Sequence, residues 1–209
     1  MKSPTRSTRL ALGLTAALVL YGGSVSAQNA SVLVVYYSLS GNTERLAGEV
    51  AKGVESVEGA GAVLMAVDTV EKEHLDAADA IALGSPTHYA NIPGAMKAAL
   101  DQWTWAMGAD LTDKVGGAFS TGGGQVGGKE HVVVSLVLFM LANRMVVAGP
   151  LYGDGKEIWG EPGASAMTGP LDPGVSDVEL DGARRLGERL ARLAIARSSK
   201  SVQQNQGDP

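Results

Sequence analysis

The sequence predicts an α/β domain built on an open, five-stranded parallel sheet with helices on both faces. Short apolar runs and helical apolar patterns alternate about five times along the chain, an order typical of a parallel sheet connected by helices. Three of the apolar runs also end in loops rich in Gly, Ser, Thr, Asn or Pro. In open parallel sheets such loops gather at one edge, where ligands bind.

The first half of the chain contains three expected strands, each a short apolar run that ends at turn residues. The helix expected after the first strand places apolar or small residues on one face, at the 3.6-residue period of an amphipathic helix. In chain order we expect a strand at 32–37, a helix at 43–57, a strand at 62–67, a short acidic turn or helix at 71–78, a strand at 79–84 and a helix at 94–102.

The second half repeats the alternation and then closes with a helix whose leucines and alanines recur at helical spacing. A segment rich in Gly, Pro and Asp precedes that helix and is expected to be an extended surface loop. The expected elements are strands at 114–120 and 145–150, helices at 130–143 and 177–197, the surface loop at 151–178 and a disordered polar tail at 198–209.

Composition excludes several kinds of site. The chain of 209 residues has a net charge of −5 and no basic stripe, which argues against nucleic acid as the main partner. It has no cysteine, so disulfides, thiolate catalysis and cysteine-ligated metals are excluded. Its three histidines are too few and too scattered to indicate a zinc site, and we expect no bound metal.

The N-terminus has the pattern of a secretory signal peptide at residues 1–27. Lys2, Arg6 and Arg9 precede an apolar run of about 12 residues, and small residues follow up to Ala27. The run is short for a bilayer span. We expect export, to the periplasm, with cleavage after Ala27 and no membrane span thereafter; the alternative is an uncleaved N-terminal anchor. Cleavage leaves a domain at 28–197 and a formal charge of −8 for the remaining chain.

The loop after the first strand is the most informative stretch. It presents Ser38, Ser40, Gly41, Asn42 and Thr43 at the start of a helix, with no Lys or Arg among them. Free backbone N–H groups and the helix dipole favour an anion there. A site of hydroxyls and amides alone suits a singly esterified phosphate better than a triphosphate with magnesium. The alternative is that Ser40 or Asn42 only caps the helix.

The loop after the third strand suits a planar heterocycle. Pro86 and Thr87 set its path, and they are followed by His88 and Tyr89, an aromatic ring beside a polar side chain. The alternative is that Tyr89 simply packs on the loop. Two tryptophans, Trp103 and Trp105, follow the next helix. Two tryptophans near a loop more often have a packing role than a functional one, but Trp105 is the better candidate for a pocket wall.

The glycine-rich loop at 121–128 precedes Lys129 with the spacing of a Walker A motif. The next residue of that motif should be Ser or Thr, which holds magnesium, but here it is Glu130, whose carboxylate would repel a triphosphate. We therefore interpret the glycines as allowing the backbone to approach a flat ring closely, with a merely flexible loop as the alternative.

Taken together, the three loops resemble those of the flavodoxin-like family, and more narrowly the WrbA-type NAD(P)H:quinone oxidoreductases. The similarity covers about residues 31–196, nearly all of the chain after the expected signal. The matching segments are 36–44, 84–91, 96–97, 100–102, 119–122 with the glycines that follow, 145–147 and 163–169.

The resemblance implies a flavodoxin-like fold, bound FMN, NAD(P)H as co-substrate and a quinone as acceptor. It implies no catalytic side chain, because in such enzymes the flavin performs the chemistry. Trp105 matches the tryptophan that lines the family's substrate pocket. The resemblance assigns Ser38, Ser40, Gly41, Asn42 and Thr43 to the phosphate, and Pro86, Thr87, His88, Tyr89, Asn91, Ser120, Thr121, Gly122, Gly123 and Gly124 to the two sides of the isoalloxazine ring.

This chain also departs from the family pattern. His88 stands where the family usually has Arg, and Asn143 stands where the family has a histidine that reaches a neighbouring subunit's site. Compared with the family pattern, the glycine loop of this chain is longer and the segment between its second and third expected strands is shorter. An export signal is unusual for the family. A homo-oligomer is possible by the same resemblance.

The sequence therefore predicts an FMN-binding oxidoreductase that passes electrons from NAD(P)H to a quinone or similar acceptor. One alternative is a one-electron carrier of the flavodoxin type, because the charge of −8 would steer a basic redox partner protein. The other is a flavin-free, flavodoxin-like interaction module, which the departures at His88 and Asn143 and the export signal suggest.

Overall fold

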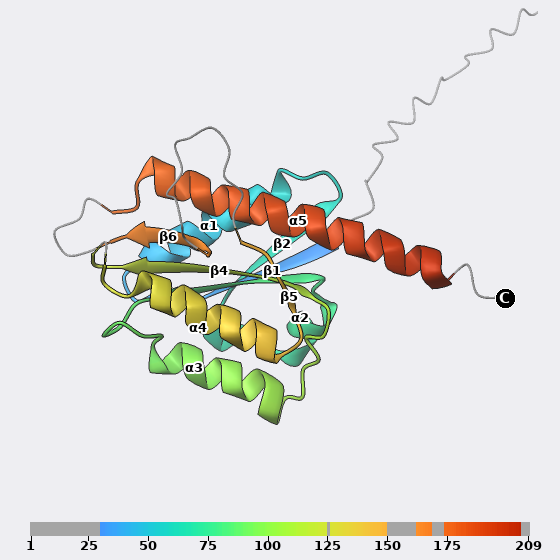
Figure 1. Cartoon of the computed structure of the whole chain (residues 1–209), viewed down its shortest axis with the longest axis horizontal. Helices are drawn as coiled ribbons and strands as arrows, with labels where there is room; N and C mark the ends of the chain where they lie inside the picture. Colours follow the sequence, from blue (N-terminus) through green and yellow to red (C-terminus); the bar gives the residue numbers. More distant parts are fainter. Residues whose placement is uncertain (1–29, 125, 150–161, 169–173, 206–209) are drawn as a thin grey trace, which may run out of the picture.

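A computed structural model describes residues 30–124, 126–149, 162–168 and 174–205. The expected signal segment 1–27 lies outside these residues. A parallel sheet forms the centre of the molecule, and its main path has the strand order β2-β1-β3-β4-β5, so the predicted fold class is confirmed (Figure 1). The strands on this path are β1 (Ala30–Tyr36), β2 (Ala60–Ala66), β3 (Ala80–Pro86), β4 (Val115–Gly122) and β5 (Val146–Val147).

The edge of the sheet beside β4 differs from the prediction. β5 has only two residues and pairs with Val115 and Gly116, whereas a further strand, β6 (Ala164–Met167), pairs in parallel with the second half of β4. The predicted surface loop at 151–178 therefore contains a strand. Its sequence, Ala-Ser-Ala-Met, lacks the branched apolar residues that signal a strand, and it is buried because small residues fit against β4.

Helices cover both faces of the sheet, as predicted. α1 and α5 lie on one face, and α3 and α4 lie on the other (Figure 1). Along β1 the side chains alternate between the two cores: Val32 and Val34 pack toward α1 and α5, while Leu33 and Val35 pack toward the opposite helices. The helical elements are α1 (Asn42–Glu55), η1 (Val67–Thr69, 3₁₀), α2 (Lys72–Ala77), α3 (Gly94–Asp101), η2 (Gln102–Ala106, one π-helical turn), α4 (Lys129–Ala142) and α5 (Asp177–Asn205).

The closing helix is longer than predicted. α5 continues to Asn205, so the tail expected to be disordered from residue 198 is helical over most of its length. Lys and Gln in that segment are good helix formers, and the first Gly or Pro after it is Gly207. At its start, Ser176 and Glu179 form a reciprocal pair: the Ser176 N–H donates to Oε2 of Glu179 at 2.8 Å, and the Glu179 N–H donates to Oγ of Ser176 at 3.4 Å.

α1 and α5 approach each other at two glycines. A Cβ at Gly53 would lie 1.9 Å from the carbonyl oxygen of Arg184, and a Cβ at Gly187 would lie 2.0 Å from that of Val50. Each helix thus places a bare backbone position against the other's carbonyl groups. This contact fixes how closely the two helices pack on the sheet.

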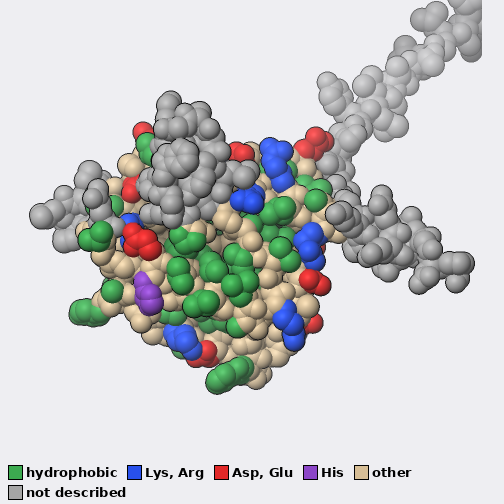
Figure 2. All heavy atoms as spheres, in the orientation of Figure 1, with side chains coloured by type: hydrophobic (Ala, Val, Ile, Leu, Met, Phe, Trp, Pro, Cys, Tyr) green, Lys and Arg blue, Asp and Glu red, His purple; other side chains and the backbone are tan. Residues whose placement is uncertain are grey.

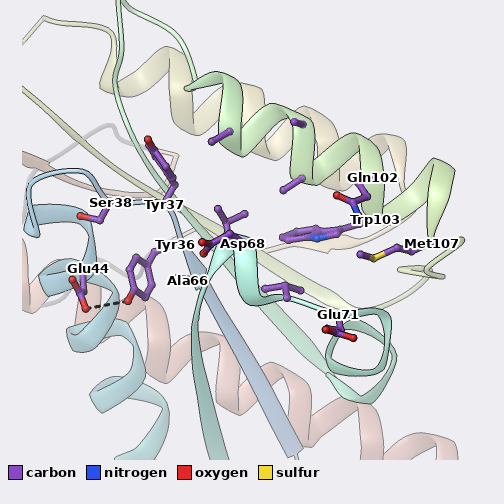
Figure 3. A pocket seen from close by; sticks show the side chains of 15 residues that line it. Tyr36, Tyr37, Ser38, Glu44, Ala66, Asp68, Glu71, Gln102, Trp103 and Met107 are labelled. Carbon is purple, nitrogen blue, oxygen red and sulfur yellow. Dashed lines mark hydrogen bonds between the residues drawn. The ribbon is translucent and has the colours of Figure 1, made fainter.

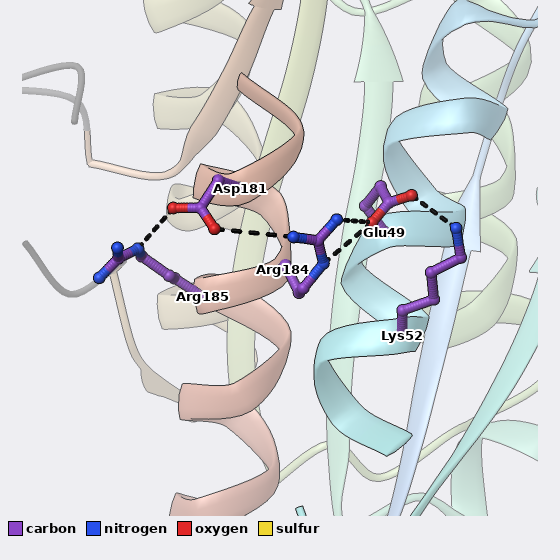
Figure 4. Close-up of polar contacts among 5 residues, drawn as sticks. All are labelled: Glu49, Lys52, Asp181, Arg184 and Arg185. Atoms are coloured by element: carbon purple, nitrogen blue, oxygen red, sulfur yellow. Dashed lines mark hydrogen bonds and ion pairs between the residues drawn. The ribbon is translucent and has the colours of Figure 1, made fainter. Parts of the chain in front are cut away.

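A cluster of charged residues spans the same helix pair (Figure 4). The Glu49 carboxylate accepts hydrogen bonds from Nζ of Lys52 at 2.7 Å and from Nε of Arg184 at 3.1 Å, and Asp181 pairs with Arg184 and Arg185. Burial alone would raise the pKa of Glu49, but the two cations outweigh burial and hold that pKa below its usual value. Glu49 is therefore ionised at neutral pH and links α1 to α5.

The glycine contact gives a matched test within one helix. We expect Gly53→Ala to destabilise the protein by roughly 1–3 kcal/mol or more, because the new methyl group must displace the backbone of α5. Gly48→Ala, also in α1, meets nothing within 4 Å and should stabilise by about 0.5–1 kcal/mol through helix propensity. Urea unfolding of the full chain measures both, and equal effects of the two substitutions would contradict the close packing.

Candidate functional site

The ends of three neighbouring strands bring the three predicted loops to one edge of the sheet. The pairing is parallel throughout: Tyr36 of β1 lies beside Gly84 of β3, and Gly84 lies beside Phe119 of β4. Each of these strands runs into one of the loops within a few residues. The loops that begin at Ser38, Thr87 and Gly122 therefore lie side by side at the carboxyl edge, where open parallel sheets bind ligands.

The loop after β1 ends at a glycine that caps α1 without a side chain. Gly41 is the N-cap, in the left-handed conformation with φ 86°, and no side chain forms a cap hydrogen bond. The Gly41 N–H donates to Oγ of Ser38 at 3.1 Å, while Nδ2 of Asn42 donates to Oγ of Ser40 at 3.4 Å. Neither Ser40 nor Asn42 caps the helix, so the N–H groups of its first turn remain available to an anion.

Buried hydroxyl groups tie the three loops together. Thr43 and Thr121 are buried, and their Oγ1 atoms are 2.7 Å apart. The Thr87 N–H donates to the carbonyl oxygen of Thr121 at 2.7 Å, and Oγ1 of Thr87 is 3.5 Å from Oγ of Ser120. Thr43 therefore has a structural bond to the third loop, in addition to the phosphate role predicted from sequence.

The second loop forms a tight hairpin. His88 and Asn91 exchange two backbone hydrogen bonds of 2.9 and 3.0 Å around Tyr89 and Ala90, whose φ angles of 50° and 61° are left-handed. Such a turn usually contains Asn or Gly, so two other residues here are strained. The turn leaves the Tyr89 side chain fully exposed, and the His88 ring meets that of Tyr37 edge-on at 6.2 Å.

Two glycines of the third loop are required by protein contacts. A Cβ at Gly122 would lie 2.7 Å from Cγ of Lys129, and a Cβ at Gly128 would lie 2.6 Å from Cα of Ala90. Gly128 is also left-handed, with φ 100°. Gly124, by contrast, faces open space, with nothing within 4 Å of a Cβ there. Of Gly122 and Gly124, both predicted to border the ring, Gly124 is the one whose Cβ position faces open space among the described residues.

Two buried polar residues beside the loops were not predicted as part of the site. Lys129 begins α4 and is 5% exposed, with its stem against Gly122 and its Nζ 3.8 Å from Oε1 of Glu130. Ser165 of β6 pairs with Ser120 of β4, and its buried hydroxyl has no hydrogen-bond partner among the described residues. In the sequence, Ser165 lies in the segment expected to be a surface loop, and Lys129 stands at the lysine position of the Walker A spacing.

The two tryptophans of η2 lie in different environments. Trp103 is buried in the core beneath α3, whereas Trp105 is 88% exposed. The role of Trp105 as a pocket wall stays a prediction. Asn143 follows α4, where its Nδ2 donates to the carbonyl oxygen of Phe139 at 2.8 Å.

Comparison with known proteins places the chain in a family. A family profile described as NADPH-dependent FMN reductase matches residues 67–157. An NAD(P)H dehydrogenase (quinone) from Syntrophobacter fumaroxidans is 36% identical over 197 residues, covering 78% of this chain and 96% of the relative. A flavodoxin from Aquifex aeolicus is 34% identical, covering 77% of this chain and 84% of the relative.

A solved structure agrees with these relatives. The flavodoxin, WrbA-like protein from Agrobacterium tumefaciens superposes with a TM-score of 0.64 at 28% identity, covering 79% of this chain and 97% of that one. Sequence identity above 30% across nearly the whole length of the relatives, together with the shared strand order, decides the assignment. The chain belongs to the flavodoxin-like family of NAD(P)H dehydrogenases (quinone).

Proposed function

We propose that this chain is an FMN-dependent oxidoreductase that passes electrons from NAD(P)H to a quinone. Its relatives bear the name NAD(P)H dehydrogenase (quinone), and the matching family profile is named for FMN reduction. The structural observation that supports the proposal best is the start of α1. There a glycine N-cap leaves the first-turn N–H groups open beside exposed hydroxyl groups.

The residues at the edge of the sheet fit FMN. In this proposal the phosphate binds the first turn of α1 with the hydroxyls of Ser38, Ser40 and Thr43, where the helix dipole favours its charge. The hairpin with Tyr89 and the loop with Gly124 border the ring. The Ser165 hydroxyl, which has no hydrogen-bond partner in the described part of the chain, lies beside Ser120 at the same edge. Bound FMN would supply hydride and electron transfer, and the chain would supply binding and orientation.

Removal of loop hydroxyls tests the phosphate site. We expect Ser38→Ala with Thr43→Ala to weaken FMN binding by at least about tenfold, since hydrogen bonds to charged groups contribute about 1.5–3 kcal/mol each. Riboflavin binding should change little, because riboflavin has no phosphate. Flavin fluorescence titrations measure both.

Thr121→Val is the matched control, because it removes the same bond between Thr43 and Thr121 but leaves the loop hydroxyls in place. It should affect the two flavins equally. Equal losses of FMN and riboflavin in the double variant would mean that the loop acts through folding alone.

Turnover tests the reaction. FMN-loaded protein should oxidise NADH or NADPH with a benzoquinone, with saturation in both substrates, as followed by loss of nicotinamide absorbance. A flavodoxin-type carrier is the second candidate, because one relative is a flavodoxin. It would instead accumulate a stabilised semiquinone during reductive titration and show no turnover with either nicotinamide.

We also propose that the chain is exported and cleaved after Ala27. β1 begins at Ala30, so cleavage there leaves every described strand and helix intact. No helix in the described part of the chain is both long and apolar enough to cross a membrane. The mass of the protein purified from its native cells should correspond to a chain that starts at Gln28, and an intact N-terminus would contradict cleavage.

α4 presents a surface that is consistent with the possible homo-oligomer. Its outer face exposes Val134, Leu138 and Leu141, and hydrophobic side chains gather over the middle of that face of the molecule (Figure 2). These three residues recur at positions i, i+4 and i+7, the spacing of a helix-packing seam. Self-association stays a prediction from the family resemblance.

A further inference from the structure

A cavity of about 810 Å³ lies beside the phosphate loop, on the face of the sheet covered by α3 (Figure 3). Its walls come from the end of β1, the start of α1, η1 and α3 with η2. The connection between β2 and β3 contains only η1 and the six-residue α2. Residues of η1 and of α3 both line the cavity, and its volume is that of a typical small-molecule site.

Flat and small side chains form much of the cavity wall. Tyr37 contributes a partly buried aromatic ring and Met107 adds a thioether, while Trp103, which is 1% exposed, borders the cavity from the core. On the side of α3 the wall consists of Ala95, Ala98 and Ala99, so the backbone of that helix lies close to the space. The walls suit a planar, apolar body.

The charge at this cavity has one sign. Glu44, Asp68 and Glu71 line it, and none of its described lining residues is Lys or Arg. None of the three carboxylates forms an ion pair within the described residues. The Tyr36 hydroxyl donates to Oε1 of Glu44 at 3.0 Å; burial, together with Glu44 and Asp68, raises the pKa of that phenol, so it stays neutral.

We propose that this cavity is a second ligand site, which binds an organic cation with a planar aromatic body. The carboxylates at its border attract the cation, and the Tyr37 ring with the alanines of α3 packs against the apolar part. Asp68 and Glu71 also repel phosphates, so the site disfavours a nicotinamide dinucleotide. The site is separate from the loops proposed to border the flavin ring and shares only Ser38 with the phosphate loop.

A charge series on one ring system tests the proposal on the flavin-free full chain. 9-Aminoacridine is a cation at neutral pH, acridine is neutral and acridine-9-carboxylate is an anion. We expect the cation to bind roughly tenfold or more tightly than neutral acridine, and the anion to bind most weakly. Acridine fluorescence follows binding, and equal affinity for all three probes would overturn the proposal.

Two variants locate the probe. Asp68→Asn with Glu71→Gln should weaken binding of the cation about tenfold and leave the affinity for neutral acridine unchanged. Ala98→Trp fills the cavity from α3 and should weaken both probes. The control, Glu73→Gln with Asp76→Asn on α2, removes the same charge outside the cavity lining and should have little effect. A similar loss of affinity for 9-aminoacridine in the control and in the variant at Asp68 and Glu71 would contradict the proposal.

Competition separates this site from the flavin site. Saturating FMN should not displace 9-aminoacridine from the cavity, because Ser38 is the one residue that the cavity lining shares with the loops proposed to bind FMN. Displacement by FMN would place the probe in the flavin site and overturn the second site. The acridine series on flavin-free protein gives its answer whether or not the chain binds FMN, so the two proposals fail independently.

Discussion

The parallel register of β1, β3 and β4 is the constraint on which the rest of the site depends. Within it, Gly84 of β3 lies directly beside Phe119 of β4, and a Cβ at Gly84 would lie 1.9 Å from a carbon of the Phe119 ring. The absent side chain lets the ring lie across the neighbouring strand, in the core under α1 and α5. A slip of one residue would break this fit and turn every buried side chain of the strand to the opposite face.

The sequence predicts the sheet and the meeting of the three loops because both depend on local patterns. Apolar runs that end in Gly, Ser, Thr or Pro are visible in a single chain, and parallel pairing then brings their ends to one edge. The spacing of Met96, Leu100 and Trp103 also indicates which tryptophan belongs to the core, since positions i, i+4 and i+7 share one helical face. This spacing favours Trp103 as the buried residue and Trp105 as the exposed one.

Other features follow only from tertiary structure. β6 is a strand because Ala-Ser-Ala fits beside β4, and small residues carry no strand signal of their own. The cavity near Asp68 is formed by residues of β1, α1, η1 and α3 that lie far apart in the sequence, and no single residue type signals it. The bond between Thr43 and Thr121 joins positions 78 residues apart. Such contacts appear only once the strands have been placed.

On one side of β4, two separate short strands complete the sheet. β5 pairs with the start of β4, and β6 pairs with its end, where the candidate site lies. The ladder of β6 can therefore open while that of β5 stays intact, so the site edge has its own local unfolding equilibrium. In hydrogen exchange, the amides of Ser120 and Gly122, on the β6 side of β4, would then report on that opening, and the Val115 amide, which donates to the carbonyl oxygen of Asp79, on the cooperative unfolding of the sheet.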